Sequence, residues 1–257
     1  MKVVLLAGGM GTRLREETEF LPKPMVQVGS RPILWHIMRN YGEYGHSEFV
    51  ICAGYKGDVI KEYFREFQSE VSDFTVTLGS KFSIEYHDQF VENGWRVTVT
   101  DTGLNTMTGG RLFKARKYIS EETFMCTYGD GLSDVNLSEL LEFHDSHGKI
   151  ATVTAVRPVS RFGVLDLQTN GAVESFREKP QADGWINAGF FVFNKKIFDY
   201  LDENSVLENE PLAKLAEDQE LMAFRHDGFW QPMDTYREYS ILNELWNTGN
   251  APWKIWN

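Results

Sequence analysis

The sequence contains only two cysteines, Cys52 and Cys126, in 257 residues. Both lie inside short apolar runs, so we expect them to be small buried hydrophobic residues on strands rather than a disulfide or a nucleophile. Two cysteines also cannot supply the ligand spacing of a zinc site.

Long apolar runs are missing as well. No stretch approaches the roughly 18 residues that a membrane-spanning helix needs. The first apolar run, Val3–Ala7, is too short for the core of a signal peptide and stops at Gly8. We therefore expect no membrane partner and a cytoplasmic location.

Positive charge is scarce: 26 Lys and Arg stand against 37 Asp and Glu, a formal net charge of −11. This balance argues against a nucleic-acid partner, because nucleic-acid binding uses a basic face. An anionic ligand would have to be held by a few placed cations and by backbone amides.

The chain also lacks internal repeats, low-complexity tracts and linkers. Its first 67 residues read as strand, loop, helix, strand and helix. Val3–Ala7 and Glu48–Ala53 are continuous apolar runs, typical of strands buried on both faces, and residues 33–41 and 59–67 follow helical spacing. This order predicts an α/β domain with a parallel sheet.

Residues 74–102 alternate in period two, which predicts an antiparallel ribbon or edge strands. The remaining elements are expected as helices at 111–118, 136–147, 195–201, 211–216 and 234–246, and as strands at 123–128, 149–156, 163–167, 172–176, 185–193 and 221–225.

The segment Gly8-Gly9-Met10-Gly11-Thr12-Arg13 follows the first strand. A glycine-rich turn at a strand end can direct backbone amides at a phosphate. It is not a P-loop, because no Gly-Lys-Ser/Thr follows, and Leu14 stands where a dinucleotide fingerprint needs a small residue. A tight turn without a ligand remains an alternative for this segment alone.

Two cations follow this loop. Arg13 offers a planar fork suited to phosphate oxygens, and Lys23 lies between two prolines that restrict its backbone. Either alone could be a solvated surface charge. Together, beside a glycine loop in an acidic protein, they favour a polyphosphate site.

Gly8–Leu14 followed by Pro22-Lys23-Pro24-Met25 resembles the signature of the sugar-1-phosphate nucleotidylyltransferases, and the resemblance covers nearly the whole chain. Gly129-Asp130-Gly131 and Trp230…Asp234-Thr235 are similar to the two metal-aspartate segments of the family. Glu178-Lys179-Pro180 and Asn187-Ala188-Gly189 are similar to its sugar-phosphate segments.

The resemblance implies a Rossmann-like, mostly parallel mixed sheet flanked by helices, with an antiparallel ribbon insertion and a short C-terminal helical region. It implies one nucleotidyltransferase domain over 1–257, with a nucleotide half (1–135), a sugar-phosphate half (136–235) and a C-terminal helix and tail (236–257). Relatives form homo-oligomers, and a second copy is an expected partner.

Several stretches, among them Met107–Leu112 and Gly228–Thr235, are most similar to family members that transfer the cytidylyl group of CTP to glucose 1-phosphate with Mg²⁺, a step of nucleotide-sugar synthesis such as that for lipopolysaccharide. UTP or dTTP, or another sugar 1-phosphate, remains an alternative. A non-catalytic regulatory protein that binds nucleotide sugars is disfavoured, because Arg13, Lys23, Asp130 and Asp234 are all present.

The resemblance assigns catalytic roles to Arg13 and Lys23 and metal ligation to Asp130 and Asp234. The nucleotide-binding residues it implies are Leu6, Ala7, Gly8, Gly9, Met10, Gly11, Thr12, Arg13, Lys23, Thr108, Gly109, Gly110, Arg111 and Gly129. The sugar-phosphate-binding residues it implies are Gly163, Glu178, Lys179, Asn187 and Gly189.

Simpler interpretations stay open for three of these features. Asp234 could merely cap a helix, Asp130 could be a turn residue, and Lys179 could be exposed in a turn. The aromatic C-terminal region could pack on its own domain, but we expect a subunit interface there, at Tyr239, Leu242, Trp246, Trp253 and Trp256.

Overall fold

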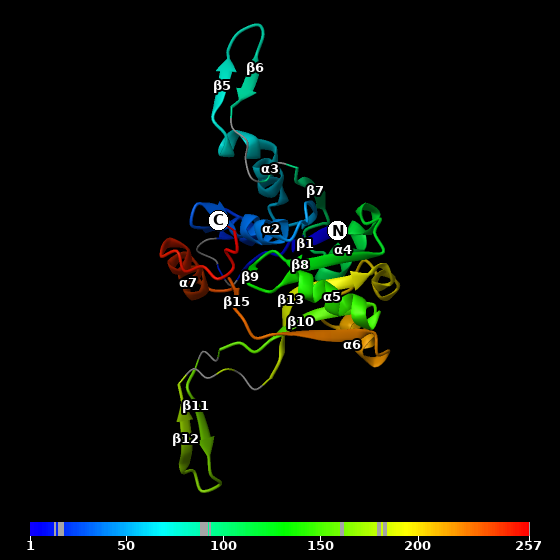
Figure 1. Cartoon of the computed structure of the whole chain (residues 1–257), viewed down its shortest axis with the longest axis vertical. Helices are drawn as coiled ribbons and strands as arrows, with labels where there is room; N and C mark the ends of the chain where they lie inside the picture. Colours follow the sequence, from blue (N-terminus) through cyan, green and yellow to red (C-terminus); the bar gives the residue numbers. More distant parts are fainter. Residues whose placement is uncertain are drawn as a thin grey trace.

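A computed structural model describes residues 1–12, 14, 18–87, 92, 94–159, 162–178, 181 and 184–256. Its centre is a seven-stranded sheet with the strand order β14-β10-β13-β8-β1-β4-β7 (Figure 1). These strands span Leu221–His226, Ala151–Val156, Ile186–Asn194, Thr123–Tyr128, Lys2–Ala7, Glu48–Ala53 and Arg96–Asp101. Only β13 runs antiparallel to both of its neighbours in this sheet, β10 and β8. The expected mostly parallel mixed sheet is therefore confirmed.

Helices cover both faces of the sheet, as the alternation of buried side chains along β1 requires. Val3 and Leu5 belong to one apolar core and Val4 and Leu6 to the other. The first core includes residues of α2 (Ile33–Glu43), α3 (Gly57–Val71), α5 (Leu137–His147) and α7 (Tyr236–Asn247). The second includes residues of α4 (Thr108–Ala115), α6 (Glu210–Glu217) and the 3-10 helix η3 (Lys195–Tyr200).

Short elements connect this framework. They are the 3-10 helices η1 (Lys23–Met25) and η2 (Arg116–Tyr118) and the paired strands β2 (Gln27–Val28) with β3 (Arg31–Pro32), and β9 (Gly131–Ser133) with β15 (Trp230–Pro232). Cys52 and Cys126 are free and fully buried on β4 and β8, as expected.

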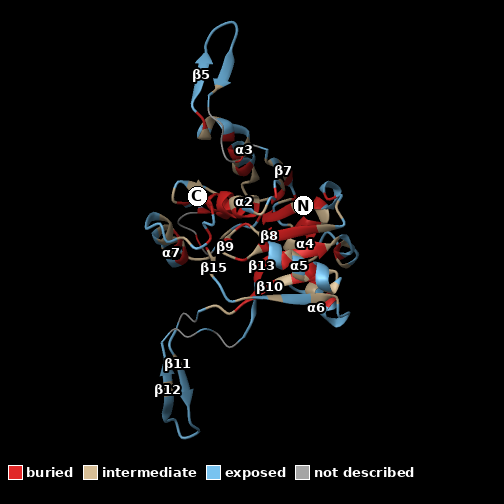
Figure 2. Ribbon diagram, in the orientation of Figure 1, coloured by how far each residue is buried: buried red, intermediate tan, exposed pale blue. Residues whose placement is uncertain are grey.

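Two antiparallel hairpins project from opposite ends of the molecule (Figure 1). They are β5 (Phe74–Thr77) with β6 (Ser83–Tyr86), and β11 (Val164–Leu167) with β12 (Val173–Arg177). Figure 2 shows both hairpins largely exposed, whereas the inner strands of the sheet, such as β1 and β8, are buried. The period-two alternation at 74–102 thus marks a hairpin followed by an edge strand, β7, which lies parallel to β4.

The sequence pattern placed one helix start incorrectly. We expected a helix from Arg111, but α4 begins at Thr108. Its first turn contains Gly109 and Gly110, which have low helix propensity. Packing against the loop before α6, described below, outweighs that preference.

The aromatic C-terminal tail does not form an exposed interface. Trp253 is fully buried and Trp256 nearly so, within the same chain. The Trp253 indole donates a hydrogen bond to Nδ1 of His36 over 3.4 Å, and Asn40 on α2 donates to the Trp253 carbonyl over 3.2 Å. The expectation of a subunit contact through these two tryptophans is wrong, because α2 already covers them.

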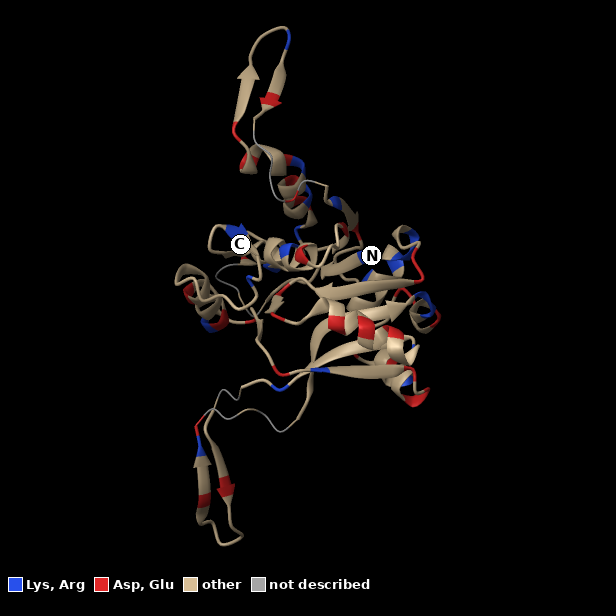
Figure 3. Ribbon diagram, viewed as in Figure 1, with Lys and Arg blue, Asp and Glu red and all other residues tan. Residues whose placement is uncertain are grey.

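Among the helices in the described residues, none has both the length and the apolar character needed to cross a membrane. In Figure 3 acidic and basic residues are spread over the surface of the molecule, and α5 carries Asp and Glu but no Lys or Arg.

Candidate active site

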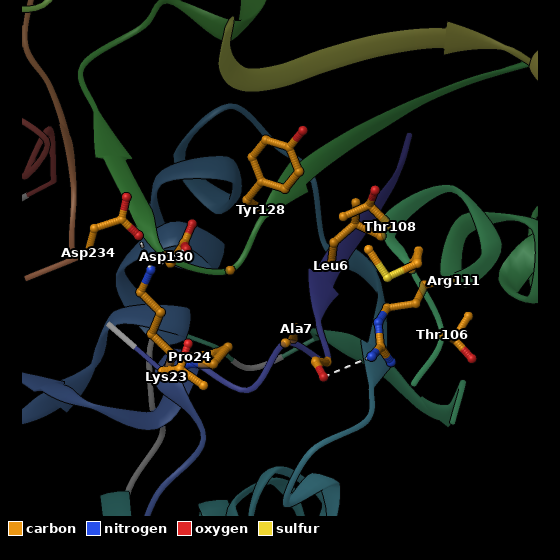
Figure 4. A pocket seen from close by; sticks show the side chains of 16 residues that line it. Leu6, Ala7, Lys23, Pro24, Thr106, Thr108, Arg111, Tyr128, Asp130 and Asp234 are labelled. Carbon is orange, nitrogen blue, oxygen red and sulfur yellow. Dashed lines mark hydrogen bonds and ion pairs between the residues drawn. The ribbon is translucent and has the colours of Figure 1, made fainter. Parts of the chain in front are cut away.

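A cavity of about 330 Å³ opens at the carboxyl ends of β1 and β8. From β1 the chain passes to β4 on one side, and it later returns as β8 on the other side. Loops leaving such a pair of strands diverge, so ligands of α/β sheets bind in the space between them. Residues 6–9 and Tyr128–Asp130 line this cavity from the two strand ends (Figure 4).

At one end of the cavity, the Lys23 ammonium lies between two carboxylates. Its Nζ is 2.6 Å from Asp130 Oδ2 and 2.6 Å from Asp234 Oδ1. Burial alone would lower the pKa of Lys23, but the two carboxylates outweigh it and raise that pKa above its ordinary value. Lys23 therefore stays charged, and the sequence-predicted catalytic lysine and both predicted metal ligands meet at one point (Figure 4).

Strand pairing places Asp234 beside Asp130. Pro232 on β15 pairs with Gly131 on β9, and the amide of Met233 donates to the Asp130 carbonyl over 2.8 Å. Two residues far apart in the chain are thereby held on adjacent backbone segments.

Asp234 is not the cap of α7. The N-cap is Thr235, whose hydroxyl accepts from the amide of Glu238 while the Glu238 carboxylate accepts from the amide of Thr235. This reciprocal pair is a capping box, and it satisfies the helix start without the Asp234 side chain. The simpler interpretation of Asp234 therefore fails, and its carboxylate binds Lys23 instead.

The glycine-rich segment lines the same cavity through Gly8, Gly9, Gly11 and Thr12. Within the described part of the chain, no acceptor is found for the amides of Gly9 and Gly11. The glycine loop and Lys23 thus line one cavity, and a glycine-rich loop beside a cation is an arrangement that can bind phosphate. Met10 lines a separate shallow hollow beside Thr12 and Tyr55.

Arg111 lines the cavity, but its guanidinium points into the protein. It donates to the carbonyls of residues 8, 53, 103 and 104 and to the hydroxyl of Thr102. Arg111 is 4% exposed and joins the loops that follow β1, β4 and β7. In this structure it supports the glycine loop, and its contact with nucleotide stays a prediction.

The start of α4 is covered by the loop before α6. The amide of Gly110 donates to Ser205 O over 2.9 Å, and a Cβ on Gly110 would lie 2.3 Å from the carbonyl of Glu203. The glycines at 109 and 110 are therefore needed for this close approach. Thr108 lines the cavity, whereas contacts from Gly109 and Gly110 to a base stay predictions.

A second cavity, of about 360 Å³, adjoins the first and shares Tyr128, Asp130 and Asp234 with it. Asn187 and Ala188 line it from β13. The two cavities meet at Asp130 and Asp234, so ligands bound in the two cavities would lie next to each other at these carboxylates.

The other predicted sugar-phosphate residues are divided. Gly163 and Glu178 are adjacent, since a Cβ on Gly163 would lie 3.1 Å from Glu178 Oε2, but they lie on the β11–β12 arm and line neither cavity. Gly189 has a φ of +83° and packs under the ring of Tyr128. Arg13 and Lys179 lie outside the described residues.

Sequence reasoning missed four polar residues at the cavities, Thr106, Thr127, Tyr128 and Glu208. Tyr128 directly precedes Gly129-Asp130, and Thr106 lies two residues before Thr108, so proximity to predicted residues could have indicated both. Nothing in the local pattern marks Glu208.

The donor set fits a hard divalent cation. Mg²⁺ takes one or two protein carboxylates and completes its shell with phosphate oxygens and water. Asp130 and Asp234 direct carboxylate oxygens at a shared point that Lys23 now neutralises. The described residues contain no cluster of three or more His, Cys, Asp or Glu side chains able to hold a metal, so phosphate oxygens would be needed.

A parallel sheet with a glycine loop, a lysine and two aspartates at its strand ends defines a class of nucleotide-binding enzymes. The chain matches the nucleotidyl transferase family over residues 2–239, and it belongs to that family.

Two curated relatives match over their full length and the full length of this chain. The glucose-1-phosphate cytidylyltransferase of Salmonella typhi is 52% identical, and the probable glucose-1-phosphate cytidylyltransferase of Bacillus subtilis is 45% identical. Among solved structures, a UDP-glucose pyrophosphorylase complexed with UDP-glucose has the same fold, with a TM-score of 0.70 and 15% identity, over 96% of this chain and 98% of that one.

Proposed function

We propose that the protein transfers the cytidylyl group of CTP to α-D-glucose 1-phosphate and releases pyrophosphate. The observation that carries this proposal is the group of Lys23, Asp130 and Asp234 at the junction of two cavities. One cavity is lined by the glycine loop and suits a triphosphate, and the other is lined by the polar groups of β13 and suits a sugar.

The reaction forms a bond between a phosphate oxygen of the sugar phosphate and the α-phosphorus of CTP, and it breaks the bond from that phosphorus to the β-phosphate oxygen. The attacking oxygen is already anionic near neutral pH, so no general base is required. Positioning and charge neutralisation then supply the catalysis. Lys23 provides a cation fixed at the point where both substrates meet.

Mg²⁺ is the proposed cofactor, and Asp130 and Asp234 are the residues that would hold it. When bound, it neutralises phosphate charge during transfer. With these carboxylates on the metal, Lys23 would be free to pair with phosphate oxygens. Arg13 is proposed as a second cation for the triphosphate.

The choice of cytosine and glucose is supported by the two full-length relatives, which are a glucose-1-phosphate cytidylyltransferase and a probable one. Thr106, just before α4, and Thr108, its first residue, line the first cavity, where the base or ribose would lie beside them. UTP, dTTP or another sugar 1-phosphate would keep the same chemistry.

The test is pyrophosphate release measured over a grid of nucleoside triphosphates and sugar 1-phosphates with Mg²⁺. Turnover that is fastest with CTP and glucose 1-phosphate is the expected result. Fastest turnover with another pair would refute the specificity, and no turnover with any pair would refute the activity.

We propose a division of the chain that follows the two cavities. Residues 1–135 contribute the glycine loop, Lys23 and the start of α4, and 136–235 contribute Asn187 and Asp234. In the C-terminal part, 236–257, the described residues Trp246 and Trp253 pack against α2.

We also propose that the protein forms a homo-oligomer and acts in the cytoplasm. The support for an oligomer is the apolar surface of the hairpin β5–β6, where Leu78 is 78% and Phe82 65% exposed. An isolated hairpin is marginal in water, so a second copy that covers it would stabilise it. Light scattering after gel filtration should give a mass that is a multiple of the chain mass, and L78E should lower the measured mass. A monomeric wild type would refute the homo-oligomer.

A further inference from the structure

The segment between η3 and α6 carries a carboxylate into the second cavity. Glu208 lies one residue after Leu207, which is fully buried in the core under α4. The amide of Leu207 also donates to the hydroxyl of Thr108 over 3.0 Å. Glu208 is therefore held in place by a buried neighbour and by the first residue of α4, although its own side chain is exposed.

The Glu208 carboxylate joins the two cavities. Its Oε2 accepts from the Thr108 hydroxyl over 2.6 Å, and its Oε1 accepts from the Tyr128 hydroxyl over 2.5 Å. Thr108 lines the first cavity, Glu208 lines the second, and Tyr128 lines both. One side chain thus connects the nucleotide side with the sugar side.

This contact fixes the direction of the Tyr128 proton. An ionised carboxylate only accepts hydrogen bonds, so the phenol must donate to it. Toward the second cavity, the phenol oxygen can therefore only accept.

Asn187 has a fixed orientation beside it. Its Oδ1 accepts from the amide of Gly189 over 2.7 Å, and its Nδ2 donates to the phenol oxygen of Tyr128 over 3.4 Å. Gly189, with its left-handed backbone, packs against the Tyr128 ring. The phenol oxygen has a second lone pair and the Asn187 amide has a second N–H, so the wall can offer a ligand one acceptor and one donor side by side.

We propose that Tyr128 is a specificity-determining residue for the sugar and that Glu208 is the positioning residue that makes it one. Together with Asn187 they recognise one hydroxyl group of the sugar 1-phosphate, which donates to the phenol oxygen and accepts from the Asn187 amide. A sugar with hydrogen or fluorine in place of that hydroxyl leaves the phenol oxygen without its donor. This proposal rests on the transfer to glucose 1-phosphate proposed above.

The test measures KM for the sugar 1-phosphate, KM for CTP and kcat in E208Q and Y128F. In E208Q only one amide oxygen remains to accept, and the amide nitrogen would aim a donor at one of the two hydroxyls. We expect each variant to raise KM for glucose 1-phosphate by about tenfold, with a smaller change in KM for CTP. E203Q is the matched control, since it removes the same charge from the same exposed loop, and we expect it to behave as wild type.

A series of monodeoxy and monofluoro glucose 1-phosphates gives the second readout. Wild type should discriminate against both analogues at one ring position by about tenfold or more, and Y128F should lose that discrimination. The double variant E208Q/Y128F should match Y128F in KM for the sugar, because both changes act through one hydroxyl.

Several results would overturn the inference. They are a KM for the sugar within twofold of wild type in both variants, equal rises in both KM values, or discrimination that survives in Y128F. The melting temperatures of both variants show whether either has a folding defect. If one has, calorimetric binding of glucose 1-phosphate to Y128F replaces the kinetic measurements. If wild type prefers another sugar 1-phosphate, the proposed function fails, and the same variants are then compared on that sugar. If no pair turns over, the affinities of wild type, E208Q and Y128F for glucose 1-phosphate, measured by calorimetry, test the sugar-binding role instead.

Discussion

Replacing Asp234 with asparagine removes one negative charge beside Lys23 while keeping the shape of the side chain. A hydrogen bond to a charged group is worth roughly 1.5–3 kcal/mol, but Lys23 keeps its contact with Asp130 and the amide oxygen can still accept from it. We therefore expect the free energy of unfolding to change by less than about 1 kcal/mol. Turnover should fall on the order of a thousandfold, equivalent to about 4 kcal/mol in the barrier.

The neighbouring residue provides the control. T235A removes the hydroxyl that caps α7, which costs about 1 kcal/mol and lowers the melting temperature by roughly 2–4 °C. Pyrophosphate release at 25 °C should change little in T235A. The reasoning fails if D234N keeps more than a tenth of wild-type turnover, or if it loses melting temperature while T235A does not.

Three further predictions concern other parts of the structure. Gly189→Ala should destabilise the fold by more than about 1 kcal/mol in urea denaturation, because an alanine Cβ would lie 2.2 Å from the Tyr128 ring at a left-handed φ; unchanged stability would contradict this. R111K should lower the free energy of unfolding by roughly 3 kcal/mol or more in the same assay, because an ammonium cannot replace the five hydrogen bonds of the guanidinium. A loss below about 1 kcal/mol would contradict the role of Arg111 in joining the three loops. Burial lowers the pKa of His36, His46 and His144 from 6.5 to about 4. Between these pH values the unfolded chain binds more protons than the folded one, so the free energy of unfolding falls as the pH falls. Calorimetry at pH 5.5 should detect uptake of about two to three protons on unfolding, and uptake near zero would contradict the lowered pKa values.

Local pattern predicted the framework because inner strands such as β1, β4 and β8 are short and mostly apolar and are each followed by glycine. The strand over Glu48–Ala53 and the helix capped by Asn136 lie where expected, since neighbouring residues decide both. The start of α4 was displaced because its glycines respond to a loop about a hundred residues later in the chain.

In the candidate site too, some residues can be recognised from the local sequence and others only from contacts with distant residues. Lys23 and Asp130 belong to segments that are recognisable in themselves, whereas Glu208 acquires a role only through Thr108 and Tyr128. The tail tryptophans were misjudged for the same reason, because an aromatic cluster at a chain end looks alike whether its own domain or another subunit covers it. Only the packing on α2 decides between them.

The Lys23–Asp234 contact joins residues 211 positions apart. A ribosome must therefore complete almost the whole chain before the lysine has its second carboxylate. A polypeptide that ends before residue 234 lacks this contact, so the lysine and the two aspartates come together only once almost the whole chain is present.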